Sequence, residues 1–128
     1  NVSEAVEYVK QTDVDFLAVA IGNAHGIYKS EPKLNFERLS ELNKTIDIPL
    51  VMHGASGLSE NDIKKAVTMG IAKINFFTDV DKAFLSGITE SLAKDPDAYT
   101  FKCFLEGRKK MEQKIRHIIE MCGCAGKA

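Results

Sequence analysis

Residues 16–21 read Phe-Leu-Ala-Val-Ala-Ile, a short uninterrupted apolar run that ends at Gly22. A run of this length and composition is typical of a strand buried on both faces of a parallel sheet. Two further runs follow at residues 50–53 (Leu-Val-Met-His, after Pro49) and at residues 73–76 (Lys-Ile-Asn-Phe). The three runs predict three strands of one parallel sheet.

Helical patterns occupy the segments before, between and after these runs. Helices are predicted over residues 3–11, 36–43, 59–69, 78–93 and about 97–121. Ser3 is expected to cap the first, and Ser59 with Asp62 has the spacing of a capping box at the third. Such alternation favours an α/β fold with right-handed crossovers. An open sheet and a piece of a (β/α)8 barrel both fit, since a complete barrel takes roughly 250 residues.

Composition places the chain among globular proteins. Of its 128 residues 45% are hydrophobic and 27% charged, with a net charge of -1. No apolar run reaches the roughly 18 residues of a membrane span, and the charge gives no reason to expect nucleic acid or a membrane surface as a partner. The three cysteines are expected to be reduced thiols in a cytoplasmic protein. The chain begins at Asn1 without Met or a signal peptide, so it is expected to be a piece whose beginning is missing.

Two histidines follow neighbouring predicted strands at corresponding places. His25 and His53 are each followed by glycine, and adjacent parallel strands lie about 4.8 Å apart. Two imidazoles so placed can share one zinc ion, although a catalytic zinc normally has three protein ligands. The alternative is that each is a hydrogen-bonded loop histidine.

An anion site is predicted beside His53. The segment Gly54-Ala-Ser-Gly57 lies between a strand and a capped helix, where backbone N–H groups can approach a phosphate and Ser56 can donate its hydroxyl. Asn75 and Thr78 lie on the next loop, and Lys29 adds charge. The alternative is that the glycines serve only a tight turn and that Thr78 caps a helix.

These segments together resemble the class II, zinc-dependent fructose- and tagatose-bisphosphate aldolases. The matching segments are residues 15–22 (DFLAVAIG), 24–28 (AHGIY), 49–57 (PLVMHGASG) and 73–75 (KIN), with Thr78. The end of the chain, residues 122–128 (CGCAGKA), is similar to that of tagatose-bisphosphate aldolases.

The resemblance implies that residues 1–128 are the C-terminal portion of one (β/α)8 barrel domain, about three βα units with C-terminal helices. It implies that His25 and His53 bind zinc, which polarises the ketone of dihydroxyacetone phosphate and stabilises its enediolate. The third zinc ligand and the aspartate that moves the proton would belong to the missing N-terminal half, so this chain has no catalytic residue of its own and is expected to be inactive alone. Substrate-binding roles are implied for Gly26, Gly54, Ala55, Ser56, Asn75, Phe76, Phe77 and Thr78.

Further implications of the resemblance are a monovalent cation (Na⁺ or K⁺) near the phosphate, a homo-oligomer (dimer or tetramer) and a role in carbohydrate metabolism such as glycolysis. The pair Phe76-Phe77 is bulky where relatives have smaller or acidic residues, which makes strict fructose-bisphosphate specificity doubtful. The apolar stripe of the long last helix is expected at a subunit interface. Two other readings stay open: a metal-free phosphate-binding barrel enzyme (isomerase or synthase), and a non-enzymatic α/β binding module.

Overall fold

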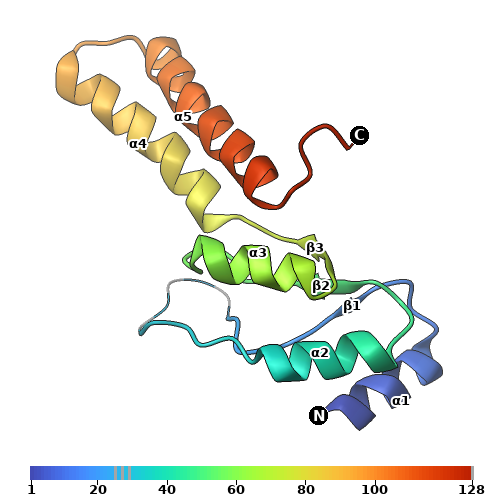
Figure 1. The fold of residues 1–128 in the computed structure, drawn as a ribbon. Coiled ribbons are helices and arrows are strands. Elements are labelled where there is room, and N and C mark those ends of the chain that lie inside the picture. Colours follow the sequence, from blue (N-terminus) through green and yellow to red (C-terminus); the bar gives the residue numbers. More distant parts are fainter. Residues whose placement is uncertain (25, 27, 29, 128) are drawn as a thin grey trace. The chain divides into compact units, whose positions relative to one another are not determined.

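A computed structural model describes residues 1–24, 26, 28 and 30–127 (Figure 1). Its elements are α1 (Val2–Thr12), β1 (Leu17–Ala18), α2 (Phe36–Thr45), β2 (Leu50–Met52), α3 (Glu60–Thr68), β3 (Ile71–Ile74), α4 (Thr78–Lys94) and α5 (Thr100–Met121). The chain divides into two units, Asn1–Phe76 with the three strands and Phe77–Ala128 with the last two helices. The element order agrees with the predicted alternation of strands and helices.

The first unit is built on a parallel sheet with the strand order β1-β2-β3. Leu17 pairs with Leu50, and Ala18 pairs with Val51. The ladder continues past the end of β1, because the N–H of Val19 donates to the carbonyl of Val51 at 3.0 Å. The carboxyl ends of neighbouring strands therefore meet at one edge of the sheet, as the predicted site requires.

A β-bulge interrupts the pairing of β2 with β3. Leu50 pairs with Ile71, but Val51 pairs with Lys73, so the register skips Ala72. Such a bulge places one extra residue on one strand and re-aims the side chains that follow it. If the first register had continued, His53 would lie opposite Ile74; with the shifted register, the residue opposite His53 is Asn75. The bulge thus brings a polar amide, in place of an apolar side chain, to the end of β2.

The core of the first unit centres on β2. All three residues of β2 are buried, as predicted for a strand covered on both faces. For residues 16–21 that prediction was wrong: Phe16 is 56% exposed and Ala18 and Ala20 are exposed, while Val19 and Ile21 are buried. Successive side chains of a strand point to opposite faces, and β1 is one of the two edge strands of the described sheet, so only every second residue of the run is covered.

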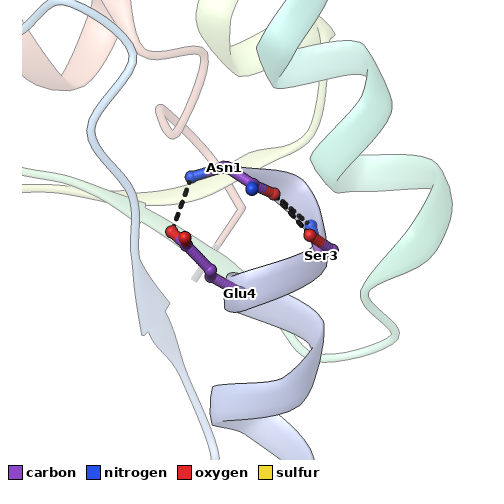
Figure 2. Close-up of polar contacts among 3 residues, drawn as sticks. All are labelled: Asn1, Ser3 and Glu4. Atoms are coloured by element: carbon purple, nitrogen blue, oxygen red, sulfur yellow. Dashed lines mark hydrogen bonds and ion pairs between the residues drawn. The ribbon is translucent and has the colours of Figure 1, made fainter.

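The helix caps agree with the predictions at α3 and differ at α1. The Ser59 hydroxyl accepts a hydrogen bond from the Asp62 N–H at 3.1 Å, as the predicted cap requires, and the Asp62 carboxylate accepts from the Ser59 hydroxyl at 2.8 Å instead of from the Ser59 N–H. At α1 the cap is Asn1 and not Ser3 (Figure 2). The Asn1 side-chain oxygen accepts from both the N–H and the hydroxyl of Ser3, and Glu4 pairs with the N-terminal ammonium at 3.2 Å. Asparagine caps helices as well as serine does, and Asn1 immediately precedes the first helical residue.

The second unit is a helical hairpin of α4 and α5. The helices approach closely at two glycines, since a Cβ added to Gly87 would lie 2.6 Å from the Cα of Gly107. The rings of Phe84 and Phe104 pack beside this point with their centroids 5.7 Å apart. The last helix begins at Thr100 and not near residue 97, because residues 95–98 form a turn closed by the Ala98 N–H on the Asp95 carbonyl. Among the described residues, no helix combines the length and the apolar character that crossing a bilayer requires.

Candidate metal and phosphate site

His53 follows β2 directly and is partly buried at the carboxyl edge of the sheet. Its carbonyl oxygen accepts a hydrogen bond of 2.9 Å from the Asn23 side-chain amide. The same Asn23 accepts from the Ile21 N–H at 2.8 Å through its side-chain oxygen. One side chain thereby joins the loop after β1 to the end of β2. No role for Asn23 was predicted from the sequence, although an amide side chain just past an apolar run can donate and accept in this way.

Tyr28 makes a second link between the same two loops. Its hydroxyl accepts from the Ala24 N–H at 2.9 Å and donates to the Gly54 carbonyl at 2.8 Å. A Cβ added to Gly57 would lie 3.3 Å from the Tyr28 ring, so the ring also covers the loop that follows β2. Asn23 and Tyr28 together hold the start of the first loop against the predicted anion site.

The loop after β2 depends on glycine at its first position. Gly54 has a φ of 63°, and a Cβ there would fall on the carbonyl group of Ala24. Only glycine combines this left-handed conformation with so close an approach of two backbones. Gly57, with a φ of 88°, ends the segment in the same region of conformational space. The two glycines allow residues 54–57 to form the turn that connects His53 to the start of α3.

The interior of this loop is small and buried. Ala55 is fully buried, and Ser56 is only 8% exposed. The N–H of Leu58 donates to the Ala55 carbonyl at 3.1 Å and closes the turn. The first turn of α3 already contains its own cap, Ser59, and two acidic residues, which weaken the attraction of this helix for an external anion. A phosphate bound here would therefore depend on the loop N–H groups more than on the helix.

His53 is adjacent to Asn75, which directly follows β3. The Asn75 N–H donates to the Met52 carbonyl at 3.1 Å, and its side-chain Nδ2 lies 3.4 Å from the His53 Nδ1. The Asn75 side-chain oxygen accepts a hydrogen bond of 2.6 Å from the Lys73 ammonium. An ammonium group can only donate, so this contact fixes which end of the amide faces His53. The N–H₂ end of the Asn75 amide therefore faces the His53 ring.

The other predicted site residues fall in three places. His25 lies outside the described residues, as does Lys29. Gly26 is described, with a φ of 88° and open space around it. Phe76 ends the first unit, whereas Phe77, which is 77% exposed, and Thr78 belong to the second. The N-cap of α4 is Phe77, without a side-chain capping bond, so Thr78 is the first helical residue and not a cap.

Of the two predicted ligands, His53 is described and has the chemistry expected of a zinc ligand. The His53 imidazole offers a ring-nitrogen lone pair, which is the group that zinc binds. Among the described residues no three His, Cys, Asp or Glu side chains gather so that they could hold a metal ion. The two-histidine site therefore stays a prediction, with His53 placed at the sheet edge and His25 outside the described residues.

The second unit has two further electrostatic features. A cleft of about 320 Å³ between α4 and α5 is lined by charged residues that pair with one another, including Lys110 with Glu90 at 3.1 Å and Lys102 with Asp95 at 3.3 Å. Hydrogen bonds from Ser86 and Lys110 lower the pKa of the exposed Glu90. At the end of α5, burial raises the pKa of the Cys122 thiol, and the neighbouring Cys124 raises it further.

Known proteins resemble this chain in sequence and in fold. Residues 1–127 match the family described as fructose-bisphosphate aldolase class II. The YdjI aldolase of Escherichia coli K12 superposes on the chain with a TM-score of 0.86 and 38% identity, over 100% of this chain and 46% of that one. The fructose-bisphosphate aldolase of Campylobacter jejuni gives a TM-score of 0.77 and 25% identity, over 96% of this chain and 43% of that one.

The chain belongs to the class II fructose-bisphosphate aldolase family. The predicted fold class is confirmed: parallel strands and helices form part of an aldolase fold, and the chain spans less than half the length of the solved aldolases that it matches. Family membership also indicates a lyase of a generally metal-dependent class.

Proposed function

We propose that this chain forms one part of a zinc-dependent aldolase that cleaves and forms a ketose 1,6-bisphosphate of the fructose or tagatose type. The products of cleavage are dihydroxyacetone phosphate and an aldehyde. The observation that carries the proposal is the position of His53, which directly follows β2, lies beside Asn75 and precedes the Gly54–Gly57 turn. Family membership and the parallel sheet that brings strand ends together support it.

The metal site would be shared between this chain and the N-terminal half of the barrel. His25 and His53 are the proposed ligands here, with one histidine and the proton-transferring aspartate in the other half. The length comparison supports such a division, since this chain corresponds to 46% of the Escherichia coli aldolase. A bound zinc ion would supply Lewis acidity toward the substrate ketone. The role of this chain is to hold His53 in place through the contact of Asn23 with its carbonyl.

The phosphate of the ketose would bind at the loop after β2. Gly54, Ala55 and Ser56 would present backbone N–H groups, with the Ser56 hydroxyl, Gly26 and Thr78 as further contacts. Gly54 and Gly57 both have left-handed φ values, and a backbone nest that binds an anion is built from successive N–H groups in right- and left-handed conformations. A sodium or potassium ion bound by nearby backbone carbonyls would offset part of the phosphate charge.

Specificity would depend on the residues after β3. Asn75 would face the reacting hydroxyl and carbonyl oxygens, while Phe76 and Phe77 would form part of the wall around the sugar. These bulky rings argue against strict fructose-bisphosphate specificity. The similarity of residues 122–128 to the end of tagatose-bisphosphate aldolases is the reason to include tagatose-type substrates. The protein is proposed to act in the cytoplasm, in carbohydrate metabolism, as a homo-oligomer. The exposed Phe104, Ile115 and Ile119 on α5 are consistent with an interface there.

Metal analysis and a cleavage assay on the full-length protein that contains this chain test the proposal. His53→Ala should lose both zinc and dihydroxyacetone phosphate release, and His117→Ala on α5 should keep both. If His53→Ala keeps full zinc and full activity, the metal assignment is wrong. If the unsubstituted protein binds dihydroxyacetone phosphate but contains no zinc, the metal-free phosphate-binding enzyme is the better reading. If it binds neither, a non-enzymatic module is favoured.

A further inference from the structure

Lys73 contacts Asn75, and Lys73 has no role so far in the proposed aldol reaction. Its ammonium lies 2.6 Å from the Asn75 side-chain oxygen, and Asn75 directly follows β3, two residues beyond Lys73. Residues two apart on a strand lie on one face, so the backbone itself sets Lys73 beside Asn75. The β-bulge that skips Ala72 sets this pair opposite the end of β2.

The contact decides which group Asn75 offers to the site. The two ends of an amide have nearly the same shape and opposite hydrogen-bonding character, so an unconstrained Asn75 can turn either end toward His53. The Lys73 ammonium only donates and occupies the amide oxygen. Asn75 must therefore present its N–H₂ group, and the 3.4 Å contact from Nδ2 to the His53 Nδ1 has this orientation.

We propose that Lys73 is a positioning residue that holds Asn75 as a hydrogen-bond donor toward the substrate oxygens beside His53. The inference rests on the proposed aldolase function and deepens it. A fixed N–H donor stabilises negative charge that develops on an oxygen, and a donor oriented in advance requires no reorganisation when that charge appears. A carbonyl in the same place would repel the charge.

The test uses the full-length, zinc-loaded protein and phosphoglycolohydroxamate, a phosphorylated hydroxamate whose planar anion resembles an enediolate. Calorimetry should show that Lys73→Met weakens its binding about fivefold to tenfold, as expected for the loss of one well-oriented hydrogen bond. Lys73→Arg, which keeps a charged donor, should recover most of the affinity. Zinc content and the affinity for inorganic phosphate should not change. Lys64→Met is the matched control, because Lys64 pairs with Glu60 on the surface of α3 in the same unit.

A double-mutant cycle separates positioning from direct contact. If Lys73 acts through Asn75, Lys73→Met should cause no further loss of hydroxamate affinity in a protein that already carries Asn75→Ala. A full additional loss, or a parallel loss of phosphate affinity, would show that Lys73 binds the ligand itself and would overturn the inference. Unchanged hydroxamate affinity in Lys73→Met alone would also overturn it while leaving the proposed function intact. Failure of the unsubstituted protein to bind zinc or the hydroxamate would overturn both.

Discussion

The Tyr28 hydroxyl donates a hydrogen bond of 2.8 Å to the carbonyl oxygen of Gly54, 26 residues further along the chain. The same hydroxyl accepts from the Ala24 N–H, so one oxygen atom bridges the loops that follow β1 and β2. These loops contain the proposed metal and phosphate ligands. Their separation therefore depends on a side chain that has no proposed contact with either metal or substrate.

Tyr28→Phe should remove the bridge and leave the ring in place. Two backbone groups lose a partner, and because this part of the site is only partly buried, the expected loss in free energy of unfolding is about 1 kcal/mol. The zinc affinity and the cleavage activity of the full-length protein should also fall, because the two loops are no longer joined. Chemical denaturation and metal titration measure the two effects. Tyr8→Phe on the exposed side of α1 is the control and should change neither. Wild-type zinc affinity in Tyr28→Phe would contradict the proposed role of the bridge.

Gly54→Ala should disrupt the turn for two separate reasons. The left-handed conformation costs an alanine about 1 kcal/mol or more, and the added methyl would collide with the Ala24 carbonyl, which cannot move without breaking the loop contacts. Gly26→Ala is the matched variant, since Gly26 also has a positive φ but nothing within 4 Å of a new Cβ. Urea denaturation should show a clearly larger loss of stability for Gly54→Ala. Equal losses would mean that the close approach to Ala24 has no energetic effect.

Much of this arrangement could be predicted because it depends on local pattern. The apolar runs and the three-to-four-residue spacing of the helices indicated every strand and helix to within a few residues, and Ser59 capped α3 as its spacing required. His53 and Gly54 could be assigned to the end of a strand for the same reason. The burial of β1 could not be predicted in this way, because it depends on the sheet order and on which neighbours cover each face.

Long-range contacts were the part that sequence patterns missed. The bulge at Ala72 has no signal in a run as short as Ile71–Ile74, and yet it determines that Asn75 and not Ile74 meets His53. The bonds of Asn23 and Tyr28 join segments about 30 residues apart, and no periodicity carries that information. The family resemblance named Asn75 for its place in a motif, whereas the contact with Lys73 comes from the strand geometry.

Ser56→Ala and Thr78→Ala should each weaken binding of dihydroxyacetone phosphate about tenfold to a hundredfold. Each removes a hydroxyl donor to a charged group, a loss of about 1.5–3 kcal/mol. Zinc content should change little, because neither residue is a proposed metal ligand. Ser86→Ala on α4, where the hydroxyl donates to Glu90, is the control for a lost hydroxyl at a residue with no proposed role in binding. Unchanged affinity in both Ser56→Ala and Thr78→Ala would refute the phosphate assignment.

The thiol of Cys122 should titrate at a higher pH than an ordinary cysteine. Burial raises its pKa, and Cys124 raises it further, so the folded chain holds this proton more tightly than the unfolded chain does. The free energy of unfolding should then fall as the pH rises from the thiol pKa of the unfolded chain, about 8.5, through the thiol pKa of the folded chain. At lower pH the thiol is protonated in both states, and Cys122 should not change the stability. The pH dependence of its alkylation by iodoacetamide, read by mass spectrometry, gives the midpoint. Cys124→Ser should lower that midpoint; a midpoint below the value in the urea-unfolded chain would contradict the assignment.

The central claim is that this chain carries part of a zinc site that becomes catalytic only when the rest of the barrel is present. The direct measurement is zinc content and release of dihydroxyacetone phosphate from a ketose 1,6-bisphosphate, for residues 1–128 alone and for the same residues co-expressed with the N-terminal half. We predict neither stoichiometric zinc nor cleavage for the chain alone, and one zinc per assembled pair with cleavage when both halves are present. A chain that alone unfolds cooperatively as a monomer, holds one zinc ion and cleaves the substrate would contradict the account.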